Sequence, residues 1–452
     1  MPEITIYITN KNYGKFLNKS INSALKQNFQ NFEIIIIDDG STDNSKKIIE
    51  KFRKKKNIRI FYRKSKGLLN NINFAIRASR ANFILRLDAD DYLDSNALTV
   101  LHKKITENKE IAMVYPDYYE VDINGKFLNL NRNISLDKQS KLKDIPAHGA
   151  CSLIRKTFLE EVGYYDVKVD RQDGFDIWFK FINNYKIKNV NIPLFYYRQH
   201  KNNLTTNQRK LLKIRSKLTQ KFVRDRNLIK KNQKIPIIIP VRGKQFDISC
   251  MSLEKLKKKR LLFYSIDQAL KCNFNKKVIV TTSDTKIIKL IRKKYSSKVF
   301  IYKRDKKMSF ENTDMKNSVL KSVSKFYKKS PQLIVILAFQ NPLRESFYIE
   351  KAVNTLVLNS TKVLFSVNRD NTGNYFFYGR KGLRPLRSDN ELKLEREAMY
   401  VQKGGISVFD FKEYKENKKI SKQYIGHIIV DERSSFEINS LSDISVCEKI
   451  FK

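Results

Sequence analysis

The sequence predicts an α/β protein with two tandem Rossmann-like domains. In the first, short apolar runs alternate with amphipathic segments of helical length, and two of these runs stop abruptly in carboxylates, at Asp38 and at Asp88. An apolar run that ends in acids is typical of a buried parallel strand that delivers them to the carboxyl edge of a sheet. A second alternating series, which starts near Ile235, predicts the second domain.

The first series begins with an apolar strand and continues as strand–helix–strand units. The expected strands are 4–8, 33–37, 58–62 and 83–87, and the expected helices are 14–27, 44–54 and 69–79. Strands that alternate with helices in this way predict a mostly parallel, doubly wound sheet. Ser41-Thr42-Asp43 precedes the second helix, and these residue types favour the N-terminal cap.

The segment 206–234 differs from both series. Apolar residues recur at helical spacing from Leu211 to Phe222 with Lys and Arg between them, which predicts a basic amphipathic helix. We interpret it as a helical linker between domains 1–205 and 235–452. Two alternatives stay open for its apolar face: packing on its own protein, or lying on an anionic membrane surface.

The second series repeats the alternation. The expected strands are 235–240, 277–282, 298–302 and 333–338, and the expected helices are 253–271, 284–295 and 313–328. Because no internal repeat or low-complexity tract interrupts the chain, two successive sheets of the nucleotide-binding type are the simplest architecture.

Composition restricts the classes of partner. The 452 residues include 90 Lys and Arg against 46 Asp and Glu, a formal net charge of +44, and the hydrophobic content of 41% is enough for packed cores. This charge fits nucleic acid, an anionic membrane surface, phosphorylated substrates, or a general excess of lysine. Because the lysines are spread along the whole chain without a DNA- or RNA-reading motif, we expect no nucleic-acid partner.

The cysteines and the apolar runs bear on cellular location. The widely spaced Cys151, Cys250, Cys272 and Cys447 form no metal-ligand pattern and fit a reducing cytoplasm. No signal peptide is visible before the first strand. Apolar runs such as 333–339 are too short to span a bilayer. We therefore expect a cytoplasmic protein, with peripheral contact at the inner face of the membrane as an alternative.

The two carboxylate clusters form the first candidate site, because ligands of open α/β sheets bind at the carboxyl edge of the strands. Asp38 or Asp39 can accept hydrogen bonds from the base or ribose of a nucleotide, or can instead cap the helix that follows. Asp88 and Asp90 can together hold a hard divalent cation against a diphosphate.

Short motifs follow one another in a fixed order through the first domain. They occupy residues 12–17, 20–27, 33–43, 66–68, 73–76, 87–91, 115–119, 148–150, 172–178 and 196–200. In this order they resemble the family 2 glycosyltransferases of the GT-A fold, over residues 3 to about 205. The resemblance implies an inverting, metal-dependent enzyme that moves a sugar from a nucleotide-sugar donor, by default a UDP-sugar, to a hydroxyl acceptor.

The resemblance also implies roles for single residues. Asp88 and Asp90 would hold Mg²⁺ or Mn²⁺, which neutralises the departing diphosphate. Asp173 would be the general base that takes the proton from the acceptor hydroxyl. Arg198 and His200 match a late family segment and could contact the donor phosphates, although a single histidine is more often structural.

Two positions depart from this family pattern. Lys11 stands where an aromatic residue often stacks on the donor base, and Ile72 stands where an arginine often lies near the donor. Because Lys11 has no ring to stack, the resemblance leaves the donor nucleobase open.

A second set of motifs runs through the second domain. It occupies residues 238–243, 261–266, 278–284, 341–344, 404–409 and 435–439, with Asp443. This set resembles the cytidylyltransferases that make CMP-activated acidic sugars such as sialic acid. The resemblance implies a nucleotide site formed by Arg242, Gly243, Lys244, Asp284 and Arg344. Glu437 would be a metal ligand of that site.

The second domain departs from its family where the chemistry is done. Asp247 ends a run, 244–247, that replaces a small, basic phosphate-binding segment, and its carboxylate would repel phosphate. Glu437 and Asn439 stand where the family has two aspartates for the metal, and a neutral Asn is a weaker ligand. Ala338 replaces a polar residue of the substrate strand. These changes favour lost or altered catalysis.

The leading hypothesis is a glycosyltransferase fused to a cytidylyltransferase-like partner, acting on a glycan, lipid-linked or protein acceptor in surface-glycan or lipopolysaccharide biosynthesis. The alternative is a bifunctional enzyme whose second domain also makes a CMP-activated acidic sugar, such as a CMP-nonulosonate, from CTP. A non-catalytic sugar binder is disfavoured, because Asp88, Asp90 and Asp173 are retained together. Related cytidylyltransferases are commonly dimers, so a homodimer through the second domain is a further expectation.

Overall fold

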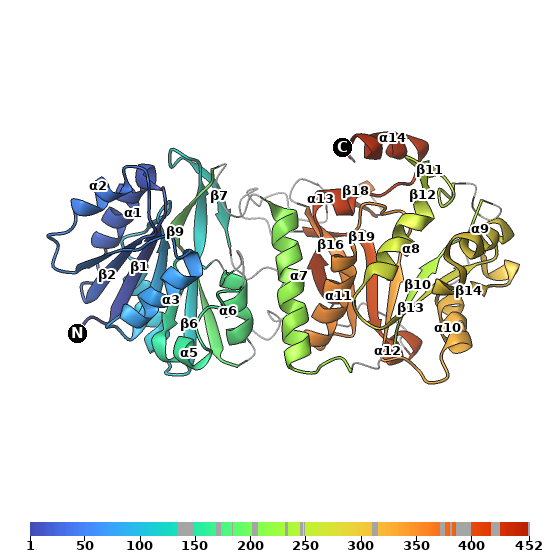
Figure 1. Cartoon of the computed structure of the whole chain (residues 1–452), viewed down its shortest axis with the longest axis horizontal. Helices are drawn as coiled ribbons and strands as arrows, with labels where there is room; N and C mark the ends of the chain where they lie inside the picture. Colours follow the sequence, from blue (N-terminus) through green and yellow to red (C-terminus); the bar gives the residue numbers. More distant parts are fainter. Residues whose placement is uncertain are drawn as a thin grey trace. The chain divides into compact units, whose positions relative to one another are not determined.

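The computed structural model comprises two compact units, and the chain passes from the first to the second between Asn207 and Gln208 (Figure 1). The structure describes residues 1–132, 149–168, 173–182, 184–200, 207–230, 234–244, 247, 249–309, 315–370, 376–379, 382–385, 399–416 and 425–450. Each unit is built on one large sheet covered by helices, which confirms the predicted α/β class with two tandem Rossmann-like domains.

The first unit contains a nine-stranded sheet in the order β3-β2-β1-β4-β8-β6-β9-β5, with β7 paired to β6. Its parallel half consists of β1 (Ile4–Asn10), β2 (Phe32–Asp38), β3 (Ile58–Tyr62) and β4 (Phe83–Asp88). Its mixed half consists of β5 (Tyr92–Leu93), β6 (Ile111–Val121), β7 (Phe127–Asn131), β8 (Leu153–Arg155) and β9 (Lys186–Arg198). The four expected strands are confirmed as the parallel half. The antiparallel pairing of β8 with β4 and β6 makes the whole sheet more mixed than the sequence predicted.

Burial of β2 shows why this half of the sheet forms. All seven residues of β2 are buried, including the run Ile34–Ile37. A parallel strand covered on both faces needs such a continuous apolar run, and each fully buried isoleucine contributes about 1.5–3 kcal/mol. The run ends at Asp38, so the first polar side chain that follows the core lies at the edge of the sheet.

The helices of the first unit fall between these strands, as expected. They are α1 (Gly14–Leu25), α2 (Ser45–Glu50), α3 (Leu68–Ala78), α4 (Ala97–Thr106), α5 (Lys156–Glu161) and α6 (Asp173–Ile182). The second helix is shorter than the predicted 44–54, because turns replace it after Glu50. The charged run that follows, 53–56, offers no apolar side chain to the core.

The second unit contains a seven-stranded sheet in the order β14-β13-β10-β15-β19-β16-β20. Its parallel strands are β10 (Ile235–Pro240), β13 (Lys276–Thr282), β14 (Val299–Lys303) and β15 (Leu333–Leu337). The remaining strands are β16 (Val363–Asp370), β19 (Met399–Asp410) and β20 (Ile425–Ile429). Two hairpins stand apart, β11 (Lys255–Leu256) with β12 (Lys259–Arg260) and β17 (Phe376–Gly379) with β18 (Gly382–Pro385).

The helices of the second unit include α8 (Leu261–Lys271), α9 (Thr285–Tyr295), α10 (Met315–Phe326), α11 (Ser346–Leu358), α12 (Phe411–Glu416), α13 (Glu432–Ser435) and α14 (Leu441–Ile450). Short 3-10 turns lie at Ser296–Lys298 and Lys306–Ser309. The expected helix 253–271 begins only at Leu261, because the β11–β12 hairpin occupies residues 255–260. An isolated two-residue hairpin has no alternating pattern that the sequence could reveal.

The basic amphipathic helix is α7 (Gln208–Asp225), and it belongs to the second unit. It runs alongside α11 (Figure 1), and Leu212 joins the hydrophobic core of that unit. The Ser216 hydroxyl donates to the Phe347 carbonyl at 2.8 Å. The apolar face of α7 therefore packs on its own protein. Across the described ranges, no helix combines the length and the apolar character needed to cross a bilayer.

Candidate functional sites

The end of β1 brings the two acid clusters of the first unit to one edge. In the strand register, Asn10 lies opposite Asp38 of β2, and Thr9 lies opposite Asp88 of β4. The three strands are parallel, so these acids flank the carboxyl end of β1. This is the edge at which open α/β sheets bind ligands.

Asp38 and Asp39 shape the loops at this edge. The Asp38 carboxylate accepts hydrogen bonds from the Asn10 amide at 2.8 Å and from the Ser41 main-chain N–H at 2.9 Å. The Asp39 carboxylate accepts from the main-chain N–H groups of Lys66 and Gly67, at 2.6 and 3.0 Å. Both side chains are about 95% buried. Neither carboxylate caps α2, the helix that follows, whose N-cap residue is Asn44; both acids instead hold loops at the edge of the sheet.

Asp88 and Asp90 are more open to solvent than Asp38 and Asp39. The Asp88 carboxylate accepts a hydrogen bond from Arg86 Nε at 2.6 Å, and 22% of the side chain is exposed. Asp90 Oδ2 lies 2.9 Å from His200 Nε2, with 16% of the side chain exposed. These are the carboxylates of the edge that a solvent-borne ligand could reach.

The carboxylates of Asp88, Asp90 and Asp91 repel one another. Burial first, and the neighbouring Asp88 carboxylate second, raise the pKa of Asp90. Asp91 is fully buried, and burial together with Asp90 and Asp88 raises its pKa well above the ordinary value. One oxygen of Asp91 accepts from the Arg198 main-chain N–H, while the other has no hydrogen-bond partner among the described atoms. A cation bound at this edge would relieve the repulsion.

Arg198 holds the main chain of the acid segment, residues 88–91. It is 97% buried, and its guanidinium donates to the main-chain carbonyls of Asp90 at 2.8 Å and Ile123 at 2.8 Å. It also lies over the Phe16 ring, 4.9 Å from the centroid. The sequence predicted that Arg198 contacts the donor phosphates. This geometry instead favours a role in which Arg198 positions Asp90.

His200 is held by aromatic rings beside Asp90. Its ring stacks on Phe16 with centroids 5.3 Å apart and lies 5.8 Å from the ring of Tyr13. Burial, Asp90 and Asp88 raise the pKa of Tyr13 to about 12. Neither Tyr13 nor Phe16 was proposed as a site residue from the sequence. Both lie in the first of the short motifs, residues 12–17, and that motif is the signal that could have identified them.

Asp173 is the first residue of α6. Its side chain lies outside the part of the chain that the structure describes, so the geometry leaves its role as general base a prediction. The neighbouring acid, Asp176, is 99% buried and pairs with Lys180 at 2.9 Å, as expected of a structural residue. Trp178 packs edge-to-face on Tyr115 with centroids 5.7 Å apart and is also buried.

Within the described residues, no three His, Cys, Asp or Glu side chains are arranged to hold a metal ion. This does not conflict with a cation at Asp88 and Asp90. Mg²⁺ is usually bound in enzymes through one or two carboxylates plus the phosphates of the substrate, and seldom by a cage made of protein alone.

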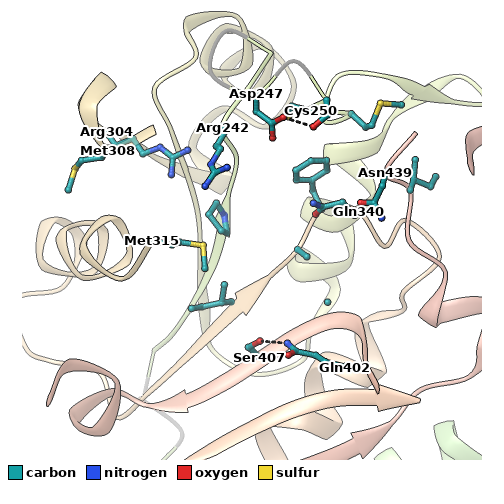
Figure 2. A pocket seen from close by; sticks show the side chains of 18 residues that line it. Arg242, Asp247, Cys250, Arg304, Met308, Met315, Gln340, Gln402, Ser407 and Asn439 are labelled. Carbon is teal, nitrogen blue, oxygen red and sulfur yellow. Dashed lines mark hydrogen bonds between the residues drawn. The ribbon is translucent and has the colours of Figure 1, made fainter. Parts of the chain in front are cut away.

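A cavity of about 400 Å³ opens in the second unit beside the end of β10 (Figure 2). Arg242 and Asp247 line it from the loop after β10, and Arg304 lines it from the loop after β14. The rest of its lining is uncharged and comprises Pro240, Ser249, Cys250, Met251, Met308, Met315, Ile336, Ala338, Phe339, Gln340, Gln402, Gly405, Ser407, Ile438 and Asn439. Arg304 was not identified from the sequence, and it follows β14 without a motif of its own.

Of the residues expected to form this nucleotide site, Arg242 alone lines the cavity. Gly243 has a φ of +85°, and a Cβ at this position would lie 2.2 Å from Asp284 Oδ2, so only glycine fits the turn. Asp284 caps α9 by accepting from the main-chain N–H groups of Lys286 and Ile287. Lys244 pairs with Glu254 at 2.5 Å.

Arg344 and Glu437 also lie off the cavity. Arg344 is 99% buried, and its guanidinium donates to the carbonyls of Gly404, Gly405 and Ala338 and to the Ser265 hydroxyl. Glu437 lies 3.5 Å from Lys403. Its burial and its four acceptors favour a structural role for Arg344 over the nucleotide contact expected from the sequence. The role of Glu437 as a metal ligand stays a prediction.

Each of the two units matches a known protein family. Residues 5–163 match the family described as glycosyl transferase family 2, and residues 237–432 match the family described as cytidylyltransferase. The chain joins a family 2 glycosyltransferase domain to a cytidylyltransferase-like domain. Both resemblances inferred from the sequence are confirmed.

The similar proteins share the chain only in part. Chondroitin synthase of Pasteurella multocida is 27% identical over 194 residues, which is 42% of this chain and 20% of that protein. Chondroitin synthase of Escherichia coli is 30% identical over 143 residues, 31% of this chain and 21% of that protein. Glycosyltransferase GlyG of Streptococcus pneumoniae is 34% identical over 121 residues, 26% of this chain and 40% of that protein. The chain thus spans less than half the length of these relatives.

Solved structures align with about half of the chain. TarS of S. aureus in complex with UDP-GlcNAc aligns with a TM-score of 0.42 at 19% identity, covering 49% of this chain and 66% of that chain. Mannosyltransferase PcManGT from Pyrobaculum calidifontis, in complex with GDP-Man and Mn²⁺, aligns with a TM-score of 0.39 at 13% identity, covering 50% of this chain and 65% of that chain.

Replacing Arg344 by methionine is expected to destabilise the cytidylyltransferase-like domain by about 3 kcal/mol or more, because several buried carbonyls lose their donor and each costs about 1–3 kcal/mol. Urea unfolding of the full chain would measure the loss. Lys244→Met is the matched control, since its exposed pair with Glu254 contributes about 1 kcal/mol at most. Unchanged stability with weakened nucleotide binding would instead restore Arg344 to the binding site.

Proposed function

We propose that the glycosyltransferase domain is an inverting, metal-dependent enzyme that transfers a sugar from a nucleotide-sugar donor, by default a UDP-sugar, to a hydroxyl acceptor. The observation that carries the proposal is the meeting of Asp88 and Asp90 with His200 at the carboxyl edge of the sheet. Membership of family 2 supports the reaction class, and the solvent-accessible acid pair supports the cation.

The residues present fit Mg²⁺ or Mn²⁺ at Asp88 and Asp90. Both carboxylates keep lone pairs beyond the hydrogen bonds described above. Burial first, and repulsion by Asp88 second, raise the pKa of Asp90, and a cation would offset the repulsion. When bound, the ion would neutralise charge on the departing diphosphate. His200 and Arg198 would hold Asp90 in place from its side-chain and main-chain sides, so that the acid segment needs little rearrangement when the donor enters.

The chemical step requires a base on the acceptor side of the donor sugar. We assign this role to Asp173, the first residue of α6, because it matches the position of the base in the family 2 motif. In its ionised form Asp173 would take the proton from the acceptor oxygen as that oxygen attacks the anomeric carbon. A single displacement at that carbon inverts its configuration.

The nucleotide would lie against the loops that Asp38 and Asp39 hold. We propose that Asp39 sets the shape of the loop at Lys66 and Gly67, while Asp38 keeps the end of β1 beside the donor. Lys11 donates to the Ser65 hydroxyl at 2.6 Å, and both side chains are exposed. A lysine here provides a hydrogen-bond donor for a base carbonyl in place of a stacking ring.

We extend the proposal to surface-glycan assembly at the cytoplasmic side of the cell. The chondroitin and hyaluronan synthases among the similar proteins favour a glycan acceptor over a protein or lipid-linked one. Peripheral membrane contact and a homodimer through the second domain remain parts of the proposal that solution measurements of membrane binding and mass can test.

The donor is tested by incubating the full chain with UDP-, GDP-, CMP- and dTDP-sugars, with Mn²⁺ or with EDTA, and measuring thermal unfolding. We expect UDP-sugars with Mn²⁺ to stabilise the protein, by about 2.7 kcal/mol when the ligand is a hundredfold above its Kd. The same shift in EDTA would contradict the metal dependence. If only another nucleotide sugar raised the unfolding temperature, that nucleotide would replace UDP as the carrier of the donor sugar.

A second candidate function is nucleotidyl transfer from CTP to an acidic sugar by the second domain, which would make the chain bifunctional. The cavity beside Arg242 favours it, because it lies at the carboxyl end of β10 and β15, where such enzymes bind nucleotides. Release of pyrophosphate from CTP in the presence of a nonulosonic acid is the direct test.

A further inference from the structure

Four aromatic side chains form a row across the mixed half of the first sheet. In the strand register, Tyr196 of β9 lies opposite Tyr92 of β5 and also opposite Tyr119 of β6. The rings of Tyr92 and Tyr196 stack with centroids 4.5 Å apart, and those of Tyr196 and Tyr119 stack at 5.1 Å. Phe127 of β7 extends the row, because its ring packs edge-to-face on Tyr119 at 5.8 Å. We call these four residues the aromatic row.

The aromatic row lies on the sheet face that points away from the hydrophobic core. Successive side chains of a strand point to opposite faces, and the neighbours Leu93 and Phe195 are both buried in that core. The tyrosines of the row are half-buried, and 44% of Phe127 is exposed. Within the ranges that the structure describes, no group forms a hydrogen bond with the hydroxyls of these tyrosines. The row therefore offers a ligand both aromatic surface and hydroxyl groups.

The inner end of the row meets the acid segment. Tyr92 follows Asp91 directly in the chain. Arg198, which holds the main chain of Asp90, lies 5.4 Å from the centroid of the Tyr92 ring, and Lys19 Nζ lies over the same ring at 3.5 Å. Two cations thus fix this ring in place. A ligand bound along the row would reach the edge of the sheet at which the donor is proposed to bind.

An oligosaccharide suits this surface. Sugar rings have C–H groups that pack on aromatic rings, and hydroxyls that exchange hydrogen bonds with phenolic hydroxyls. The row crosses four neighbouring strands, a span of about 14 Å at the usual strand spacing, which is longer than a single sugar. A lipid chain on the same surface would leave the tyrosine hydroxyls without partners in an apolar environment, which costs free energy. The chemistry of the row therefore favours a glycan over a lipid.

We propose that the aromatic row binds the acceptor glycan as an extended oligosaccharide, with its accepting end near Tyr92 and its earlier sugars along the row toward Phe127. The inference rests on the proposed sugar transfer. It adds that the acceptor contains several sugars and identifies the residues that hold them. Because cross-strand aromatic pairs also stabilise a sheet by themselves, the test measures how binding depends on glycan length and does not rely on stability.

The test uses an array of oligosaccharides from bacterial surface polysaccharides, printed as mono- to hexasaccharides, with the labelled full chain and no donor. We expect binding to strengthen with length and to level off once the row is filled. Absence of binding to every oligosaccharide, or equal binding of mono- and hexasaccharides, would overturn the proposal. Because no donor is present, this result is separate from the donor test above. Glycan binding without any effect of a nucleotide sugar would contradict the proposed transfer instead.

Variants at two points of the row locate the bound glycan. Phe127→Ala, at the exposed outer end, is expected to weaken binding of hexasaccharides by about threefold to tenfold and to leave disaccharides unaffected. Tyr196→Phe keeps the ring and removes one hydroxyl, so it should weaken binding by about twofold to tenfold. Thermal unfolding checks that each variant is folded.

Tyr185→Ala and Tyr185→Phe are the matched controls. Tyr185 directly precedes β9, at the opposite end of that strand from Tyr196, and its hydroxyl donates to Glu161 at 2.9 Å. Binding by both controls should equal that of the parent chain. Equal losses at Tyr185 and Tyr196, or a loss in Phe127→Ala that is the same for every glycan length, would overturn the proposal. Binding to phosphatidylglycerol vesicles that Phe127→Ala abolishes, without glycan binding, would assign the row to a membrane surface.

Discussion

Replacing Asp173 by asparagine is expected to lower sugar transfer by about 10²- to 10⁴-fold, the usual contribution of a general base. Asparagine keeps the size of the side chain but has no lone pair basic enough to take the acceptor proton. Binding of the donor should change little, because Asp173 would act on the acceptor. Steady-state kinetics measures the rate of transfer, and a separate binding experiment measures the affinity for the donor.

Glu107→Gln is a suitable control for this substitution. It also converts a carboxylate to an amide in the first domain, but at an exposed side chain at the end of α4 that pairs with Lys104. Transfer by this variant should be unchanged. Near-normal turnover in Asp173→Asn, or loss of donor binding equal to the loss of turnover, would show that another residue is the base.

Replacing Asp90 by asparagine is expected to lower the affinity for the cation, and with it for the donor, by about 100-fold or more. Changes to residues that merely support a metal ligand already cost about 10–100-fold, and Asp90 is proposed as a ligand itself. The dependence of transfer rate on Mn²⁺ concentration, and the Tm shift with donor plus Mn²⁺, measure the effect.

The same substitution should leave the protein without cation as stable as before, or more stable. Burial and Asp88 both disfavour the charge on Asp90, so removing that charge relieves repulsion within the acid segment, and the lost bond with His200 offsets part of the gain. Lost activity with retained stability is the signature of a carboxylate kept for binding. A fall in stability of the cation-free protein would assign Asp90 to the scaffold, and activity unaffected by Mn²⁺ in both proteins would remove the cation from the mechanism.

The sequence predicted the edge of the first sheet well, because each strand there is a continuous apolar run that ends in an acid. Ile34–Ile37 leads to Asp38 and the run of β4 leads to Asp88, and the strand register places both beside the end of β1. It could not show what each acid holds. The hydrogen bonds from Asp39 to Lys66 and Gly67 span 27 and 28 residues of sequence and depend on loop conformation.

In the second domain, the fold was easier to predict than the site. Gly243 and Arg242 were identified from a motif, yet Lys244, two residues from Arg242, turns toward Glu254. Arg344 resembles a ligand contact in the sequence but donates to three main-chain carbonyls within the fold. An arginine in a motif indicates that its guanidinium N–H groups make hydrogen bonds. Only the three-dimensional structure shows whether the acceptors belong to a ligand or to the main chain.

The packing of α7 decides where the chain can be divided. A fragment that begins at Ile235 would remove this helix from α11, take Leu212 out of the hydrophobic core, and leave the Phe347 carbonyl without the Ser216 hydroxyl. A fragment that begins at Asn207 keeps the helix and its contacts. Anyone who separates the two halves to study them alone should therefore cut before the helix, although the sequence pattern invites a cut after it.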